Sequence, residues 1–225
     1  MRMRPVLLAG IAILASPALG LAQNQVANPD FDSTLAPWAG VASSAPDPVG
    51  SGTASWTSAH NLDNQPGSGS ADTTLAGQPG QPANASFGIR QCVALPGAPV
   101  TVTEASYEAS FLARAADNPA DGLASATVEV RFFSDTACTS FIPGAGGSQG
   151  VRLTSGSILD DTQWWTIGDA QFLPPGGAIA ASSAEVRAFL RTVATTSNGY
   201  HVFLDRILLT LNGTTPVELQ SLEAR

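Results

Sequence analysis

The sequence contains no lysine. All ten basic residues are arginines, against 18 acidic residues, so the formal net charge is −8 over 225 residues. Only 12% of the residues are charged, which excludes a coiled coil, a histone-like protein and a charged disordered chain. Nucleic acids and anionic membrane surfaces are bound through clustered Lys or Arg. We therefore expect neither as a partner, and the composition indicates a loop-rich β protein.

Long apolar runs are also lacking, apart from one near the N-terminus. Arg2 and Arg4 precede an apolar stretch over residues 6–15, and Gly20 and Ala22 occupy the −3 and −1 positions of a signal-peptidase site. The apolar stretch is shorter than the ~20 residues that a membrane-spanning helix needs. The pattern predicts a cleaved secretory signal peptide over residues 1–22.

Cleavage would leave a mature chain that begins at Gln23. We expect a single domain over residues 23–213 and a short tail over residues 214–225, secreted or periplasmic and free of the membrane. This mature chain keeps eight arginines against 18 acids, a net charge of −10.

Cysteine is scarce, with only Cys92 and Cys138 present. In an oxidising compartment two cysteines usually form a disulfide. The alternative is a catalytic or metal-bound thiol pair, which the lack of CxxC spacing and of an adjacent histidine disfavours. On loop entropy, the predicted disulfide stabilises the fold by about 4 kcal/mol.

No amphipathic helical stripe exceeds about two turns; most apolar segments alternate with a period of two. Val128, Val130 and Phe132, for example, alternate with Thr127, Glu129 and Arg131. We expect clear strands over residues 86–95, 105–113, 126–133, 163–173, 185–194 and 202–209. Gly- and Pro-rich turns between them predict an all-β fold, a two-sheet antiparallel β-sandwich or jelly roll.

Several motifs occur together in an order that resembles a known family. Asn28-Pro-Asp-Phe-Asp32 is followed by Trp38, residues 88–93 by Pro96-Gly97, and Trp165-Thr166 by the segment 199–209, in which aromatic residues precede an aspartate. This series resembles the CenC-type carbohydrate-binding modules of secreted bacterial proteins, which are galactose-binding-like β-jelly rolls. The resemblance implies that residues 28–32 form the first strand and that Trp165 lies in the core.

The same resemblance implies a structural calcium ion held by Asp32 and Asp205, with Asn28 or Asp30 as further oxygen donors. Asp205 also lies in a segment that is otherwise apolar on both faces, and a buried carboxylate needs a cation or several hydrogen-bond donors. The alternatives are exposure to solvent or an ion pair with one of three arginines: Arg187, Arg191 and Arg206. No organic cofactor is expected.

A sugar site needs aromatic faces and polar side chains. Neighbours in a strand point to opposite faces, so with Trp165 in the core we assign Trp164 to the surface. Trp38 is also assigned to the core. The expected site comprises two tryptophans and four polar residues: Trp56, Trp164, His60, Asn61, Asp63 and Gln91.

Enzyme signatures are missing as well. The two histidines, His60 and His201, are 141 positions apart, and no nucleophile elbow, zinc-protease helix or phosphate loop occurs. The first hypothesis is a secreted, non-catalytic carbohydrate-binding protein whose partner is a poly- or oligosaccharide. The alternative is an extracellular structural or protein-interaction domain on the same scaffold without a sugar site. A small glycan hydrolase or lyase is a third, more distant reading.

Overall fold

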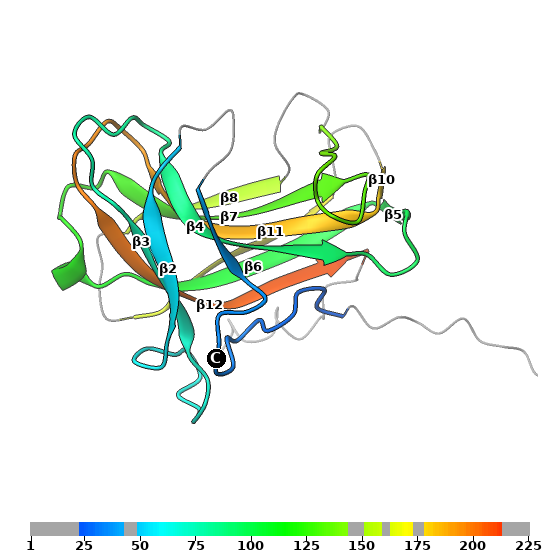
Figure 1. Cartoon of the computed structure of the whole chain (residues 1–225), viewed down its shortest axis with the longest axis horizontal. Coiled ribbons are helices and arrows are strands. Elements are labelled where there is room, and N and C mark those ends of the chain that lie inside the picture. The colour runs from blue at the N-terminus through cyan, green and yellow to red at the C-terminus, as the bar shows by residue number, and fades with distance from the viewer. Residues whose placement is uncertain (1–22, 43–48, 144–150, 159–162, 173–177, 213–225) are drawn as a thin grey trace, which may run out of the picture.

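A computed structural model describes residues 23–42, 49–143, 151–158, 163–172 and 178–212 (Figure 1). The predicted signal peptide and tail lie outside these residues. Apart from one 3-10 turn (Ala115–Asp117), the described secondary structure is all β. The strands are β1 (Ala39–Ala42), β2 (Gly52–Thr57), β3 (Ser70–Leu75), β4 (Ser86–Ala94), β5 (Val100–Val102), β6 (Glu104–Leu112), β7 (Ala124–Phe133), β8 (Val151–Ser157), β9 (Trp165–Phe172), β10 (Ile179–Ala181), β11 (Ser183–Thr192) and β12 (Tyr200–Leu211).

The strands form two five-stranded antiparallel sheets, as predicted. The first sheet has the order β1-β4-β11-β7-β8 and the second the order β2-β3-β12-β6-β9, while β10 and β5 pair separately. Figure 1 shows β8, β7, β11 and β4 side by side, with β6 and β12 in the other layer. Each of the six strands expected from alternation is present to within a few residues. The closing strand β12 lies at the centre of its sheet, as its apolar sequence indicates.

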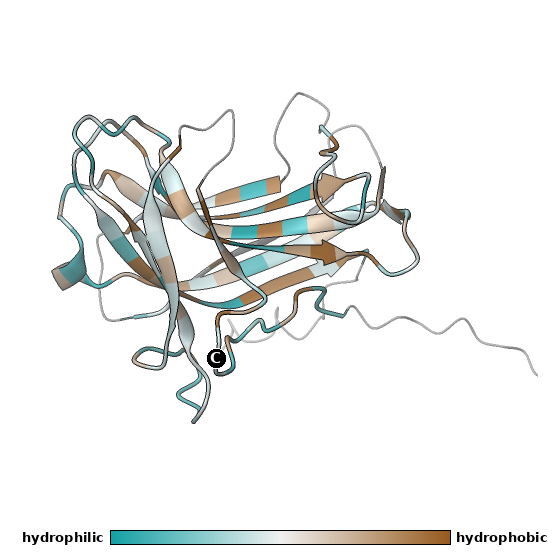
Figure 2. Ribbon diagram, viewed as in Figure 1, coloured by the Kyte–Doolittle hydropathy of each residue, from teal (hydrophilic) through white to brown (hydrophobic). Residues whose placement is uncertain are grey.

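The core fills the space between the sheets. Val128 and Val130 of β7 face it together with Tyr107 of β6 and Leu204 of β12, all at most 1% exposed. Alternation places these residues inside because successive side chains of a strand point to opposite faces. Figure 2 shows the alternation as bands of apolar and polar colour along β7 and β11. Fully burying one such side chain stabilises the fold by about 1.5–3 kcal/mol.

The predicted disulfide is confirmed. Cys92 and Cys138 are bonded, with their Cα atoms 6.0 Å apart. Cys92 belongs to β4 and Cys138 to the turn after β7, and these two strands flank β11. The Cys138 sulfur lies 3.2 Å from the hydroxyl oxygen of Ser183 in β11. The bond therefore crosses one strand and ties its two neighbours together.

The first-strand assignment is wrong. Residues 28–32 contain a bend and a turn and no strand, and the first strand of the described residues begins at Ala39. Asn28, Phe31 and Ser33 have φ of 49°, 50° and 59°, a left-handed conformation that a strand does not contain. The Asn28 amide donates to the carbonyls of Thr34 and Ala36 at 2.8 and 2.9 Å, and its oxygen accepts the Asp32 N–H at 2.7 Å. These bonds close the segment into a compact loop.

Candidate functional site

The four tryptophans differ in their exposure to solvent. Trp38 is 4% exposed and in the core, as predicted. Trp56 and Trp164 are half-buried. Trp165 is 49% exposed, so its assignment to the core is wrong.

The error at Trp165 comes from its position in the sheet. Trp165 pairs in register with Phe111 of β6, which is 5% exposed, and paired residues share a face. Its direction is therefore inward, as the family resemblance implied. However, β9 is an edge strand, as is β8 in the facing sheet, and β8 presents Ser155, Gly156 and Ser157 there. These small residues leave the indole uncovered.

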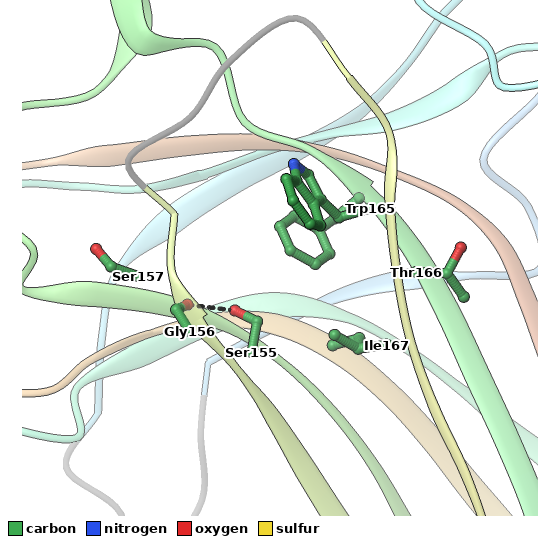
Figure 3. A pocket seen from close by; sticks show the side chains of 7 residues that line it. Ser155, Gly156, Ser157, Trp165, Thr166 and Ile167 are labelled. Carbon is green, nitrogen blue, oxygen red and sulfur yellow. Dashed lines mark hydrogen bonds between the residues drawn. The ribbon is translucent and has the colours of Figure 1, made fainter.

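A pocket lies between these two edge strands. It has a volume of about 320 Å³ and is lined by residues of β6, β8 and β9: Phe111, Ser155, Gly156, Ser157, Trp165, Thr166 and Ile167. Figure 3 shows Trp165 across the hollow from Ser155 and Gly156. An exposed aromatic face beside hydroxyl groups is the arrangement that sugar binding requires.

Two of the three hydroxyls at the pocket already have partners within the protein. The Ser155 hydroxyl accepts the Ala126 N–H at 3.0 Å and donates to the Gly156 carbonyl at 2.6 Å (Figure 3). The Thr166 and Ser110 hydroxyl oxygens are 3.0 Å apart and share a hydrogen bond. None of the lining residues in the described part of the chain is charged. The pocket is therefore mainly an apolar surface.

None of the six residues predicted to bind a ligand lines this pocket. Gln91 is 4% exposed, and its side chain exchanges two hydrogen bonds, of 2.7 and 2.8 Å, with the backbone of Ala27. It supports the N-terminal segment and does not face solvent, contrary to its predicted place. Trp56 is half-buried and donates from its indole N–H to the Phe31 carbonyl at 2.7 Å.

Three more of the predicted residues, His60, Asn61 and Asp63, belong to the loop between β2 and β3, which packs on the closing strand. The His60 ring lies 4.2 Å from the Phe203 ring, centre to centre, and Phe203 also contacts His201, at 4.7 Å. Asn61 donates to the Ser68 carbonyl at 3.3 Å. The structure therefore brings together two histidines that are distant in the sequence.

Asp63 and Asp205 meet in an acidic cluster beside this loop. Asp205 is 1% exposed and accepts the Leu62 N–H at 2.8 Å and the Arg206 N–H at 2.7 Å. Burial raises the pKa of Asp205 to about 6, and the carboxylates of Asp30 and Asp63 add to the rise against these two donors. Burial also raises the pKa of Asp30, with Asp63 adding to the rise and Arg206 opposing it.

The Arg206 guanidinium is the cation of this cluster. It pairs with Asp63 and lies 4.0 Å from Asp30. The other two expected calcium ligands are Asp32 and Asn28. Asp32 is exposed and its charge adds to the raised pKa of Asp30, and the Asn28 side-chain oxygen accepts the Asp32 N–H. Within the described ranges, no three His, Cys, Asp or Glu side chains surround a common point suited to a metal.

A buried array of charges on the outer face of the first sheet was not predicted. Glu129 and Glu185 are each 1% exposed. Glu129 contacts Arg131 and Arg152, both at 3.1 Å, and Glu185 contacts Arg187 and, at 2.8 Å, Arg90. Alternation places these residues opposite the core, but it carries no information on what covers that face.

Comparisons with known proteins establish the class of fold. No protein-family model matches the chain, and no curated protein matches its sequence. Solved structures do match, and at low sequence identity they show one thing, a two-sheet β-sandwich.

An arabinose-bound α-L-arabinofuranosidase aligns with 85% of this chain at 11% identity and a TM-score of 0.55, and the chain spans only 27% of that enzyme's length. A cyclase from Fischerella sp. TAU, in complex with 4-(1H-indol-3-yl)butan-2-one, aligns over 84% of this chain and 96% of its own, at 12% identity and a TM-score of 0.51. A xylan-binding carbohydrate-binding module from Paenibacillus barcinonensis aligns over 87% and 98%, at 11% identity and a TM-score of 0.48. The CenC-type resemblance stays a prediction.

Among the described residues there is no helix of the length and apolarity that crossing a bilayer would require.

Proposed function

We propose that the protein binds carbohydrate without cleaving it, with Trp165 as the stacking platform. The supporting observation is the 49% exposure of this indole at the mouth of a pocket with hydroxyls on its other side. The C–H face of a pyranose packs against such a ring. The proposal keeps the predicted aromatic sugar site but replaces Trp56 and Trp164 with Trp165 as its stacking residue.

The non-catalytic role is part of the proposal. Glycoside hydrolysis uses a pair of carboxyl groups on either side of the scissile bond. The described residues that line the pocket include no acid and no histidine, so these side chains supply no general acid or base. Secretion also remains proposed, and the disulfide supports it because such bonds persist in oxidising compartments. N-terminal sequencing of exported protein that begins at Gln23 would agree with it.

The test is binding to a glycan array with wild type, Trp165→Ala and a matched control. Phe141→Ala is that control because Phe141 is another exposed aromatic, 38% accessible, and does not line the pocket. We expect Trp165→Ala to weaken glycan binding at least about tenfold and Phe141→Ala to leave it unchanged. Equal binding by all three proteins would reject the site. A wild type that binds no glycan would favour the alternative, an extracellular interaction domain without a sugar site.

We also propose a structural calcium ion at the cluster of Asp30 and Asp205. The Asp30 and Asp63 carboxylates share the Arg206 guanidinium there, and both carboxylates add to the raised pKa of the buried Asp205. Calcium prefers six to eight oxygen ligands, so backbone oxygens would have to complete the set. When bound, the ion would supply positive charge that holds the loop to the closing strand.

Thermal unfolding tests this second proposal. Millimolar calcium should raise the melting temperature of the wild type but not that of Asp205→Asn, and magnesium should do less. A melting temperature that neither calcium nor a chelator shifts would refute it.

A further inference from the structure

The pocket beside Trp165 offers a ligand chiefly apolar contact. Phe111, Trp165 and Ile167 line it, and none of the residues that the structure describes there is charged. Its volume of about 320 Å³ is near the lower end of the range of about 300–1,000 Å³ found for small-molecule sites. This space suits one sugar ring rather than several residues of a chain.

Few polar groups remain to pair with sugar hydroxyls. The hydroxyls of Ser155 and Thr166 are engaged within the protein. Of the polar side-chain atoms lining the pocket, the Ser157 hydroxyl and the Trp165 indole N–H are the ones with no partner in the described part of the chain. A fully hydroxylated hexose would bury several hydroxyls here without partners, which is unfavourable.

A methyl group fits this lining better than a hydroxyl because its burial against apolar side chains is favourable. We propose that the pocket recognises a 6-deoxyhexose, a single sugar residue with a methyl group at C6, at the end of a glycan. One face of the ring would stack on Trp165, with the methyl group directed toward Phe111 and Ile167. This inference rests on the proposed carbohydrate binding and names the sugar class.

Matched sugar pairs that differ by one hydroxyl provide the test. Isothermal titration would compare L-fucose with L-galactose, L-rhamnose with L-mannose, and 6-deoxy-D-glucose with D-glucose. We expect at least one 6-deoxy sugar to bind about tenfold more tightly than its parent, a modest ratio typical of apolar discrimination. A Cβ atom at Gly156 would meet no atom within 4 Å, so Gly156→Leu can occupy the pocket without a clash at Cβ. The preference should be lost in Gly156→Leu and Trp165→Ala and kept in Phe141→Ala.

Other outcomes separate this inference from the proposed function. Parent sugars that bind as tightly as their 6-deoxy partners, or glycans that bind while no 6-deoxy sugar does, would overturn the inference and leave carbohydrate binding standing. Binding of indole that Gly156→Leu abolishes, without binding of any sugar on the array, would overturn both. A preference unaffected by Gly156→Leu and Trp165→Ala would place recognition elsewhere and also reject this pocket.

Discussion

The half-buried carboxylate of Asp121 links the loop before β7 to the loop between β11 and β12. It accepts the Leu123 N–H at 2.9 Å, the Asn198 amide at 2.8 Å and the Tyr200 hydroxyl at 2.9 Å. Burial acts to raise the pKa of Asp121, but these donors outweigh it and the pKa is lowered. A carboxyl whose pKa is lower in the folded state stabilises the fold above its unfolded pKa of about 3.9, and this contribution is lost as the pH falls below it.

Asp121→Asn should therefore destabilise the protein at neutral pH and have less effect in acid. We expect a loss of about 1 kcal/mol at pH 7 by urea denaturation, because an amide accepts these hydrogen bonds less strongly than a carboxylate. The difference from the wild type should shrink toward pH 3. Tyr200→Phe, which removes one donor, should cost a similar amount at pH 7. A difference that is undiminished at pH 3 would contradict the role of the charge.

The sequence predicted which side chains point toward the core better than it predicted whether other residues bury them. The inward direction of Trp38 and Trp165 was anticipated, but only Trp38 is buried, because the cover over Trp165 depends on Gly156 and its neighbours in another sheet. Gln91 could not be assigned correctly either. Its partner Ala27 is 64 positions away, and a polar side chain in a strand gives no sign of such a contact.

At the scale of elements, the sequence pattern was sufficient to predict six of the twelve described strands but not which strands are neighbours. Strand β11 lies between β4 and β7, partners far from it in the sequence, and no turn signal specifies this arrangement. The loop over residues 28–32 was missed because Asn28 and Phe31 within it, and Ser33 just after it, adopt positive φ, which the motif alone does not reveal. The pocket could not be predicted from the strands alone, because it forms only where β8 and β9 are edge strands of the two facing sheets.

The disulfide links elements that β11 separates, so its removal should be costly. Its cysteines are 46 positions apart, and restricting a loop of this length in the unfolded chain stabilises the fold by about 4 kcal/mol on the loop-entropy estimate. We expect the Cys92→Ser/Cys138→Ser double variant to lose about 2–4 kcal/mol in guanidinium unfolding. Reducing agent should destabilise the wild type to the same extent and leave the double variant unchanged. Equal stability of wild type and double variant would contradict this estimate.

In the charge array across β4, β11, β7 and β8, the loss of stability on removing a charged side chain should depend strongly on how buried that side chain is. Glu185 is 1% exposed and contacts two arginines, whereas the Arg90 side chain is 47% exposed. Removing one partner of a buried ion pair leaves uncompensated charge, so Glu185→Gln should cost about 3 kcal/mol. Arg90→Ala should cost less than about 1 kcal/mol, as at an exposed pair. Similar losses in the two variants, measured by urea unfolding, would show that the array is hydrated.

At the scale of the whole molecule, one apolar cluster joins the two sheets. Leu204 and Leu209 of β12 and Val128 and Leu190 of the facing sheet all belong to it. The acidic excess has little part in this arrangement, because overall charge affects solubility and association more than fold. The single domain remains a prediction, and it can be tested by the cooperativity of unfolding.

Leu204→Ala tests whether the sheets unfold together. Leu204 is 1% exposed at the centre of the second sheet, and the cavity left by the truncation should cost about 3 kcal/mol. If one core serves both sheets, far-UV circular dichroism and tryptophan fluorescence should report a single, coincident transition that shifts as a unit. Val193→Ala, at a residue 53% exposed, should change stability by less than about 0.5 kcal/mol. Two separated transitions in Leu204→Ala would mean that the sheets unfold independently, because only the sheet that contains β12 would then have lost its packing.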